Sequence, residues 1–311
     1  MIKNLISTLL ESAFLLNQDD FNKKLASHPF SPCSGSEKLK IGYAIHDDTD
    51  LFVRSIGNHL VFKFITEKKS VPGPVVKAEL ADQVKKYTEQ FGEKPNKGII
   101  RDMKENIIAT MLPRAFPKRS ELLIWIDTEA QRVNFATSSA KAAEEAISFL
   151  HRALGDMPKT YLIDTKDTPQ RAMTNWLLSD EPPSGFTVDD KCENVTPIEG
   201  KPTIKYVRHD LNGEEIRSYI GEGMVVTSLA LTHNNEFSFM LNDKFVIKGI
   251  KSTDMINDRV IEDDLEWAGE FLLYADGLSS MTTDLIEALG GLHDRNDSES
   301  NEDEQEEKLA A

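Results

Sequence analysis

The chain contains few of the residues that signal a disulfide framework, a zinc site or another cofactor site. It has two cysteines, Cys33 and Cys192, and they lie too far apart in the sequence for a Cys-x-x-Cys motif. A disulfide framework needs more cysteines than this, so both are expected to be reduced, unpaired thiols. The seven histidines are scattered along the chain and suggest no zinc site. We therefore expect neither a metal nor a cofactor.

Long apolar runs are also scarce. The opening run, residues 5–16, is interrupted by Glu11 and is shorter than the roughly 20 residues that a membrane span needs. Lys3 is the only cation before this run, and no small-residue cleavage pattern follows it, so a signal peptide is not expected. The sequence therefore predicts a cytoplasmic protein without membrane contact.

Motifs of phosphate-transfer and metal chemistry are missing as well. No GxxxxGK[ST] loop is present, so ATP-driven chemistry has no support. Two acidic runs, His46-Asp47-Asp48 and Glu262-Asp263-Asp264, could hold a divalent ion, but neighbouring side chains diverge instead of converging on one ion. Solvated turns are the preferred interpretation, and we expect no enzymatic activity. A metal-dependent nuclease that uses Asp263 and Asp264 is kept as the weakest alternative.

The charge is distributed unevenly along the chain. The formal net charge is −16, yet residues 61–119 hold thirteen Lys and Arg against seven acids, a net +6, which leaves −22 for the rest. Such segregation is typical of a protein with two surfaces for different partners. Scattered lysines can attract phosphates, but they do not form a base-reading motif, and no helix-turn-helix or zinc finger is visible. The alternative is a solvated helix whose lysines only maintain solubility.

Residues 112–128 contain a cluster of cations and an aromatic residue directly before a strand that must be buried. Arg114, Lys118 and Arg119 surround Phe116, while Pro113 and Pro117 stiffen the loop at both ends. The apolar run 122–126 follows directly. This arrangement favours a contact surface, and the alternative is an ordinary strand-entry loop with surface charge.

The patterns along the chain predict an α+β fold with mixed or antiparallel sheets and flanking helices. We divide it into an N-terminal α+β region (1–178) that includes the basic helical segment 61–119, a linker (179–202), a C-terminal α+β region (203–293) and an acidic tail (294–311). The tail has eight acids, two bases and no aromatic residue, so it is expected to be disordered. Helices are expected at 19–27, 75–91, 99–111, 139–154, 214–220 and 282–289. Strands are expected at 5–16, 41–45, 51–56, 60–65, 122–127, 132–137, 225–231, 236–241 and 244–250.

Seven segments, in this order, carry a resemblance to a known family. They are LASHPFSPC (25–33), VPGPVVKAEL (71–80), MLPRAF (111–116), LLIWIDT (122–128), SSAKAAEEAISFLHRALG (138–155), GMVVTSLAL (223–231) and LIEALGG (285–291). The chain resembles the RdgC family of recombination-associated bacterial DNA-binding proteins, and the likeness covers nearly its whole length.

The resemblance implies an elongated, horseshoe-like monomer that closes into a ring-shaped homodimer around duplex DNA. Phe116 matches the family's apolar finger at a dimer contact, and Arg114 matches a basic residue beside it. Arg208 and His209 match a basic-polar pair associated with DNA binding, and Lys77 matches the lysine of the family's PxPV(V/I)K segment. Together with the cations of the basic segment, the predicted DNA-binding residues are Lys77, Lys94, Lys97, Arg101, Arg114, Lys118, Arg119, Lys205, Arg208 and His209.

The function implied by the resemblance is sequence-independent binding of double-stranded DNA, with single-stranded DNA as a second candidate ligand. The protein would then be nucleoid-associated, act in recombination and replication-fork maintenance, and limit the access of RecA to DNA. The alternative is a protein-interaction module that antagonises RecA or another recombination protein directly, without binding DNA.

Overall fold

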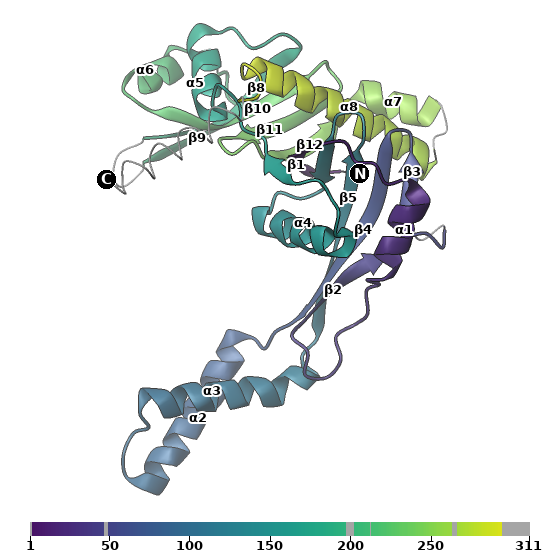
Figure 1. Ribbon diagram of the computed structural model, residues 1–311. Helices are drawn as coiled ribbons and strands as arrows, with labels where there is room; N and C mark the ends of the chain where they lie inside the picture. The colour runs from purple at the N-terminus through teal and green to yellow at the C-terminus, as the bar shows by residue number, and fades with distance from the viewer. Residues whose placement is uncertain (1, 47–48, 197–201, 212, 263–265, 294–311) are drawn as a thin grey trace, which may run out of the picture.

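The structure is a computed structural model that describes residues 2–46, 49–196, 202–211, 213–262 and 266–293. Within these ranges the chain has an open antiparallel sheet and eight α-helices, which confirms the predicted α+β class (Figure 1). The acidic tail (294–311) and the aspartates Asp47, Asp48, Asp263 and Asp264 lie outside the described residues. None of the described helices combines the length and the apolar composition that a membrane crossing requires.

Every pairing between two named strands is antiparallel, and the main path through the sheet is β2-β4-β5-β6-β1-β12-β11-β10-β8-β9. β3 pairs with β4, and β7 pairs with β1. The first seven strands are β1 (Asn4–Leu10), β2 (Leu39–Ala44), β3 (Val53–Ile56), β4 (His59–Lys69), β5 (Pro117–Asp127), β6 (Arg132–Phe135) and β7 (Thr160–Leu162). The other five are β8 (Phe186–Val195), β9 (Thr203–Val207), β10 (Val225–His233), β11 (Phe237–Asn242) and β12 (Ile247–Ser252).

Two hydrophobic cores lie on the sheet. In the first, α1 (Gln18–Ala26) and α4 (Ala140–Leu154) contribute Phe21 and Leu150, which pack on β4 and β5 residues such as Phe62. The second core joins α5 (Pro169–Ser179), α6 (Glu214–Gly221) and α8 (Trp267–Ala288) to strands β8 to β12. A further helix, α7 (Asp254–Glu262), follows β12. The two cores meet at β1, where Leu5 belongs to one and Ile6 to the other.

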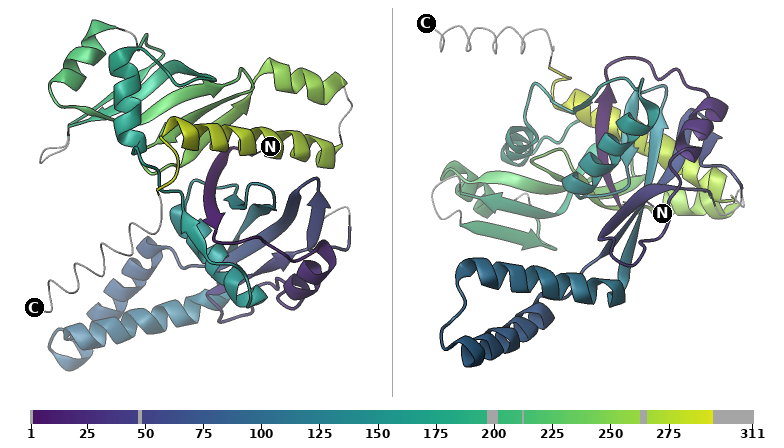
Figure 2. Two further views of the ribbon diagram at one scale, coloured as in Figure 1. Left: turned by 45° about the horizontal axis from the view of Figure 1, so that its top comes forward. Right: turned by 60° about the horizontal axis from the view of Figure 1, so that its bottom comes forward.

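A pair of helices projects from the far end of β4 and β5 (Figures 1 and 2). α2 (Gly73–Phe91) ends at Gly92, whose φ of 75° suits glycine, and α3 (Lys97–Met111) begins after Asn96, whose side chain accepts a hydrogen bond from the Ile99 N–H. A short 3-10 turn, η1 (Leu112–Arg114), leads into β5. Both helices were predicted correctly to within about two residues, because glycine, proline and asparagine mark their ends.

Several predicted boundaries were wrong. The first strand ends at Leu10, not at residue 16, and β5 begins at Pro117, so Lys118 and Arg119 lie on a strand and not in a loop. Proline is tolerated at Pro117 because it is the first residue of the strand. The segment predicted as a linker, 179–202, contains β8, which pairs with both β10 and β9. α5 and α7 were not predicted, and α8 begins at Trp267, fifteen residues before the predicted start at 282.

Gly277 allows α8 to pack directly on the second core. A Cβ at this position would lie 2.4 Å from Cε2 of Phe237, whose ring is fully buried. Alanine favours a helix over glycine by about 1 kcal/mol, but overpacking a rigid core costs about 1–3 kcal/mol. We expect Gly277→Ala to lower the free energy of unfolding, measured by urea denaturation, by about 1–2 kcal/mol. Gly221→Ala, at a site with no atom within 4 Å, is the matched control, and a Gly277→Ala protein as stable as the wild type would contradict the packing.

Candidate nucleic-acid interface

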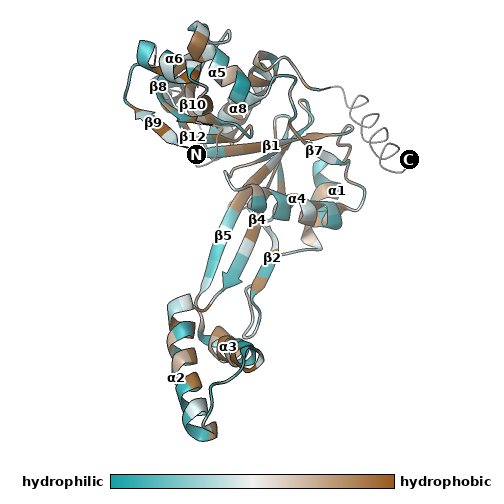
Figure 3. Ribbon diagram, turned by 90° about the vertical axis from the view of Figure 1, so that its left-hand side faces the viewer, coloured by the Kyte–Doolittle hydropathy of each residue, from teal (hydrophilic) through white to brown (hydrophobic). Residues whose placement is uncertain are grey.

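The positive charge of residues 61–119 is concentrated on strands, not on the helical pair. α2, α3 and their connection (73–111) hold seven cations and six acids, a net +1. The remainder of the window holds six cations and one acid, a net +5. These six cations lie on β4 and β5 and in the turn before β5: Lys63, Lys68, Lys69, Arg114, Lys118 and Arg119. All of them except Lys63, which is opposite Leu123, lie beyond the core. Figure 3 shows the outer parts of β4 and β5 as hydrophilic, in contrast to the ends that enter the cores.

The β4–β5 ladder is the element that carries these cations away from the cores. It comprises eleven residue pairs, from His59 opposite Asp127 to Lys69 opposite Pro117. Residues 117–121 are exposed, whereas Ile124 and Trp125 further along β5 are buried. The outer part of β5 therefore presents its side chains to solvent, whereas Glu67 and Lys69 on the outer part of β4 are buried.

Arg119 is not a free cation. Its Nε and Nη2 donate to Oε2 of Glu67 at 3.2 and 3.1 Å, and its guanidinium lies 4.7 Å from the ring centroid of Phe30. The backbone N–H of Cys33 donates to the other oxygen of Glu67 at 2.8 Å. The Cys33 N–H, together with the Arg119 guanidinium, holds the pKa of Glu67 below its ordinary value. Arg119 thus fastens the segment before β2 to the ladder.

Phe116 lies between η1 and β5 and is 93% exposed, more than any other large hydrophobic side chain among the described residues. Its neighbours Arg114 and Lys118 are also exposed. An aromatic ring left in water beside two cations has the character of a contact residue, because nothing in the described part of its own chain covers it.

The predicted cations of the helical pair are exposed but do not converge on one point. Lys77 is in α2, Lys94 and Lys97 flank the start of α3, and Arg101 is in α3, where its Nε lies 3.5 Å from the carboxylate of Asp102. Since acids nearly balance cations on these helices, their electrostatic attraction for a polyanion is weak.

The second predicted group, at the end of β9, lies far from the helical pair in the same chain (Figure 1). Lys205 forms an ion pair with Glu193 at 3.1 Å. The His209 ring stacks on Tyr206 with centroids 5.2 Å apart, and its Nε2 is 3.9 Å from a Glu215 oxygen. Arg208 is exposed, with a left-handed φ of 56°. A carboxylate therefore compensates the charge of Lys205, whereas Arg208 has no ion pair with a described residue.

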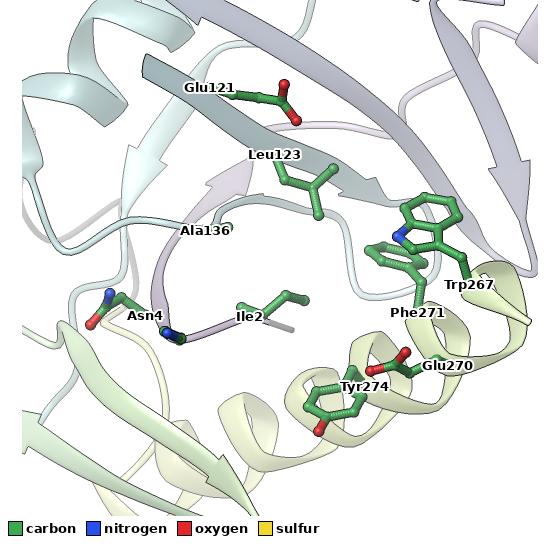
Figure 4. A pocket seen from close by; sticks show the side chains of 10 residues that line it. Ile2, Asn4, Glu121, Leu123, Ala136, Trp267, Glu270, Phe271 and Tyr274 are labelled. Carbon is green, nitrogen blue, oxygen red and sulfur yellow. The ribbon is translucent and has the colours of Figure 1, made fainter. Parts of the chain in front are cut away.

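Two cavities among the described residues have linings that bear on ligand binding. One, of about 380 Å³, lies between the start of β1, β5 and the first turns of α8 (Figure 4). Its walls include Trp267 and Phe271, and its charged lining is Glu121, Glu270 and Lys3. Because its carboxylates outnumber its cation, it does not suit a phosphate.

The other cavity adjoins a buried polar cluster that docks α8 on β4, β5 and β6. His59 Nε2 lies 2.9 Å from Asp276, Arg132 donates to the Ser279 carbonyl at 2.9 Å, and the Ser279 hydroxyl donates to Asp127 at 2.5 Å. Apart from His59 Nδ1, which is buried without a hydrogen-bond partner among the described residues, these groups pair with one another, so their first role is structural. Within the described ranges, no three His, Cys, Asp or Glu side chains are grouped as metal ligands.

Comparisons with known proteins agree on one family. A family model described as "Putative exonuclease, RdgC" matches residues 1–292. Proteins named "Recombination-associated protein RdgC" from Cupriavidus pinatubonensis and Cupriavidus necator are 34% and 33% identical over 293 residues, which is 93% of this chain and 98% of each relative. The protein of that name from Proteus mirabilis is 32% identical over 298 residues, with the same coverage. The family description names a nuclease, whereas the relatives' names refer only to recombination.

The contacts of Glu67 predict a pH dependence of stability. Because its pKa in the folded protein is lower than the ordinary 4.5, its stabilising contribution is present above that pH and is lost as the pH falls through the folded-state pKa. We expect the thermal midpoint of the wild type to fall more steeply below pH 4.5 than that of Glu67→Gln, which is already less stable at neutral pH. Glu89→Gln, which removes an exposed pair with Lys85, should follow the wild type. Parallel curves for the wild type and Glu67→Gln would show that Glu67 does not hold the segment.

Proposed function

The chain belongs to the RdgC family, and on this premise we propose that it is a non-enzymatic protein that binds double-stranded DNA without sequence preference. Its role is in recombination and replication-fork maintenance. Single-stranded DNA is a second ligand of the same surface, because the attraction is to phosphates and not to base pairs. In the cell the protein is cytoplasmic and nucleoid-associated.

The observation that carries this proposal is the separation of charge between the outer β4–β5 ladder and the rest of the chain. A body of net −22 repels DNA, so binding requires cations placed where the acids do not cancel them. The Debye length is about 8 Å at physiological salt, so local charge outweighs total charge. Residues 61–72 and 112–119, which include the outer ladder, carry a net +5, and the helical pair between them adds +1. The outer ladder places these cations on a projecting element and so meets that requirement.

In the proposed assembly, two chains close into a ring around the duplex, and Phe116 forms one of the dimer contacts. Arg114 and Lys118 flank this contact, so closure places cations from both chains around the DNA. A ring on the duplex limits the access of RecA by occupying the DNA, without any covalent chemistry.

A second candidate function is direct antagonism of RecA or another recombination protein without DNA binding. The exposed ring of Phe116 favours it, because large exposed apolar groups also anchor protein interfaces. A binding assay that contains only this protein and DNA distinguishes the two candidate functions.

The DNA proposal predicts binding that weakens steeply with salt. In fluorescence anisotropy with a labelled duplex of about 30 base pairs, log K should fall linearly with log salt, by about 0.9 for each phosphate contact. Duplexes of unrelated sequence should bind with equal affinity, since phosphate contacts carry no sequence information. Absence of binding at low salt would reject DNA binding and leave the protein-partner function.

The dimer proposal predicts that Phe116→Ser separates the chains. The wild type should show twice the chain mass of 34.9 kDa in light scattering after size-exclusion chromatography, and Phe116→Ser should show that mass once. Leu15→Ser, at another side chain that is 88% exposed, should leave the dimer intact. A Phe116→Ser protein with the wild-type mass would remove Phe116 from the interface.

A further inference from the structure

The outer ends of β2, β4 and β5 form a polar surface that continues one face of the first core. Side chains directly opposite one another in the register share a face, and every second residue of a strand returns to it. From the core outward, this face has three cross-strand rows: Tyr43–Phe64–Leu122, Ile41–Thr66–Ser120 and Leu39–Lys68–Lys118. The first row contains buried residues, and Ser120, Lys68 and Lys118 in the outer rows are exposed.

Lys68 and Lys118 stand directly opposite each other in the ladder. Like charges in this position repel and weaken strand pairing. Neither lysine forms an ion pair with any described residue, so the repulsion is not offset there. An anion bound between them would offset it.

On the other face of the same strands, two cations are compensated by acids, and Lys69 is buried with its Nζ donating to the Ser34 carbonyl at 3.3 Å. Arg119 pairs with Glu67, and Lys63 lies 3.6 Å from Glu121. Among the cations of the ladder, Lys68 and Lys118 are therefore the two that are exposed and not compensated by a described acid.

The neighbouring row supplies neutral donors. Thr66 and Ser120 are opposite each other and on the same face as the two lysines. Neither hydroxyl has a side-chain hydrogen bond to a described residue. Two ammonium groups and two hydroxyls make a set of donors that suits a ligand rich in acceptors, as the oxygens of phosphodiesters are.

We propose that Lys68, Lys118, Thr66 and Ser120 form a phosphate-binding platform for the DNA backbone. This rests on the proposed function and identifies which part of the basic segment makes the contact. A duplex carries one charge per about 1.7 Å of its axis, so adjacent phosphates can reach both rows at once. An acidic peptide, with its carboxylates on flexible side chains, lacks this fixed array.

The test compares salt dependence in three proteins. Lys68→Ala/Lys118→Ala should lower the magnitude of the log K against log salt slope by about 1.8 and weaken binding at least tenfold near 0.1 M salt, equally for unrelated duplexes. The control Lys244→Ala/Lys248→Ala removes two exposed lysines from the β11–β12 hairpin and should keep the wild-type slope. Thr66→Val/Ser120→Ala should weaken binding without changing the slope, because it removes no charge.

The outcomes separate this inference from the proposed function. If the wild type does not bind duplex at low salt, the proposed function itself fails. If the wild type binds and the Lys68→Ala/Lys118→Ala protein has the same slope, only the platform fails. If the Lys68→Ala/Lys118→Ala protein has both a lower affinity for DNA and an altered mass in light scattering, the lysines act in dimerisation, and the proposed contact with the DNA backbone is overturned. Poly-glutamate and unlabelled duplex can be compared as competitors of the labelled duplex at equal charge and ionic strength. If poly-glutamate competes as effectively as duplex, the assignment of the platform to DNA is overturned.

Discussion

The architecture depends on the hydrogen bonds of β1 along both edges. A buried strand cannot leave its backbone N–H and C=O groups unpaired. Asn4 and Leu5 pair with β12, residues 6–9 pair with β6, and residues 8–10 pair with β7. The first ten residues thereby join segments more than 120 and 240 positions away, and they divide one sheet into two faces with separate cores. α8 strengthens this connection between the two parts of the sheet, because its residues form polar contacts with β4 and β6 on one side and an aromatic contact with β11 on the other.

The pairing of β1 and the contacts of α8 fix only one end of β4 and β5. Trp125 and His59 are held there by packing and by the polar cluster around α8. The opposite ends of β4 and β5 extend beyond the core. Every second side chain of a strand lies on the same face, so the face that carries Phe64 and Leu122 at the edge of the core carries lysines two rows further out. Lys68 and Lys118 can stand at this position without loss of apolar packing, because both are exposed to solvent, and their mutual repulsion is the cost. The helical pair inserted between the strands then lies at the end of the projection.

Local signals in the sequence were sufficient for elements that end in marked turns. Asn234 and Asn235, with φ of 47° and 56°, form the predicted turn between β10 and β11, and Gly92 ends α2. The outer half of β5 could not be predicted, because Lys118, Arg119 and Ser120 lack strand-like apolar alternation and become a strand through pairing with β4. The first fifteen residues of α8 were missed because the buried side chains lie on more than one side of the helix, which hides the helical period. The pairing of Lys68 with Lys118 is a matter of register between strands 50 positions apart, and no local pattern reveals it.

On the proposed function, the charge distribution implies that one chain alone would hold DNA poorly. Exposed and unpaired cations of the ladder lie at one end, Lys205 of the group at β9 is paired with Glu193, and the chain outside residues 61–119 has a net charge of −22. A duplex attracted to the outer ladder of one chain would face repulsion elsewhere and be held from one side only. Phe116 is two residues from Lys118, so a dimer contact at Phe116 would bring the cations of a second chain to the same duplex and double the local positive charge. In this arrangement dimerisation and DNA binding depend on the same few residues, and loss of one should weaken the other.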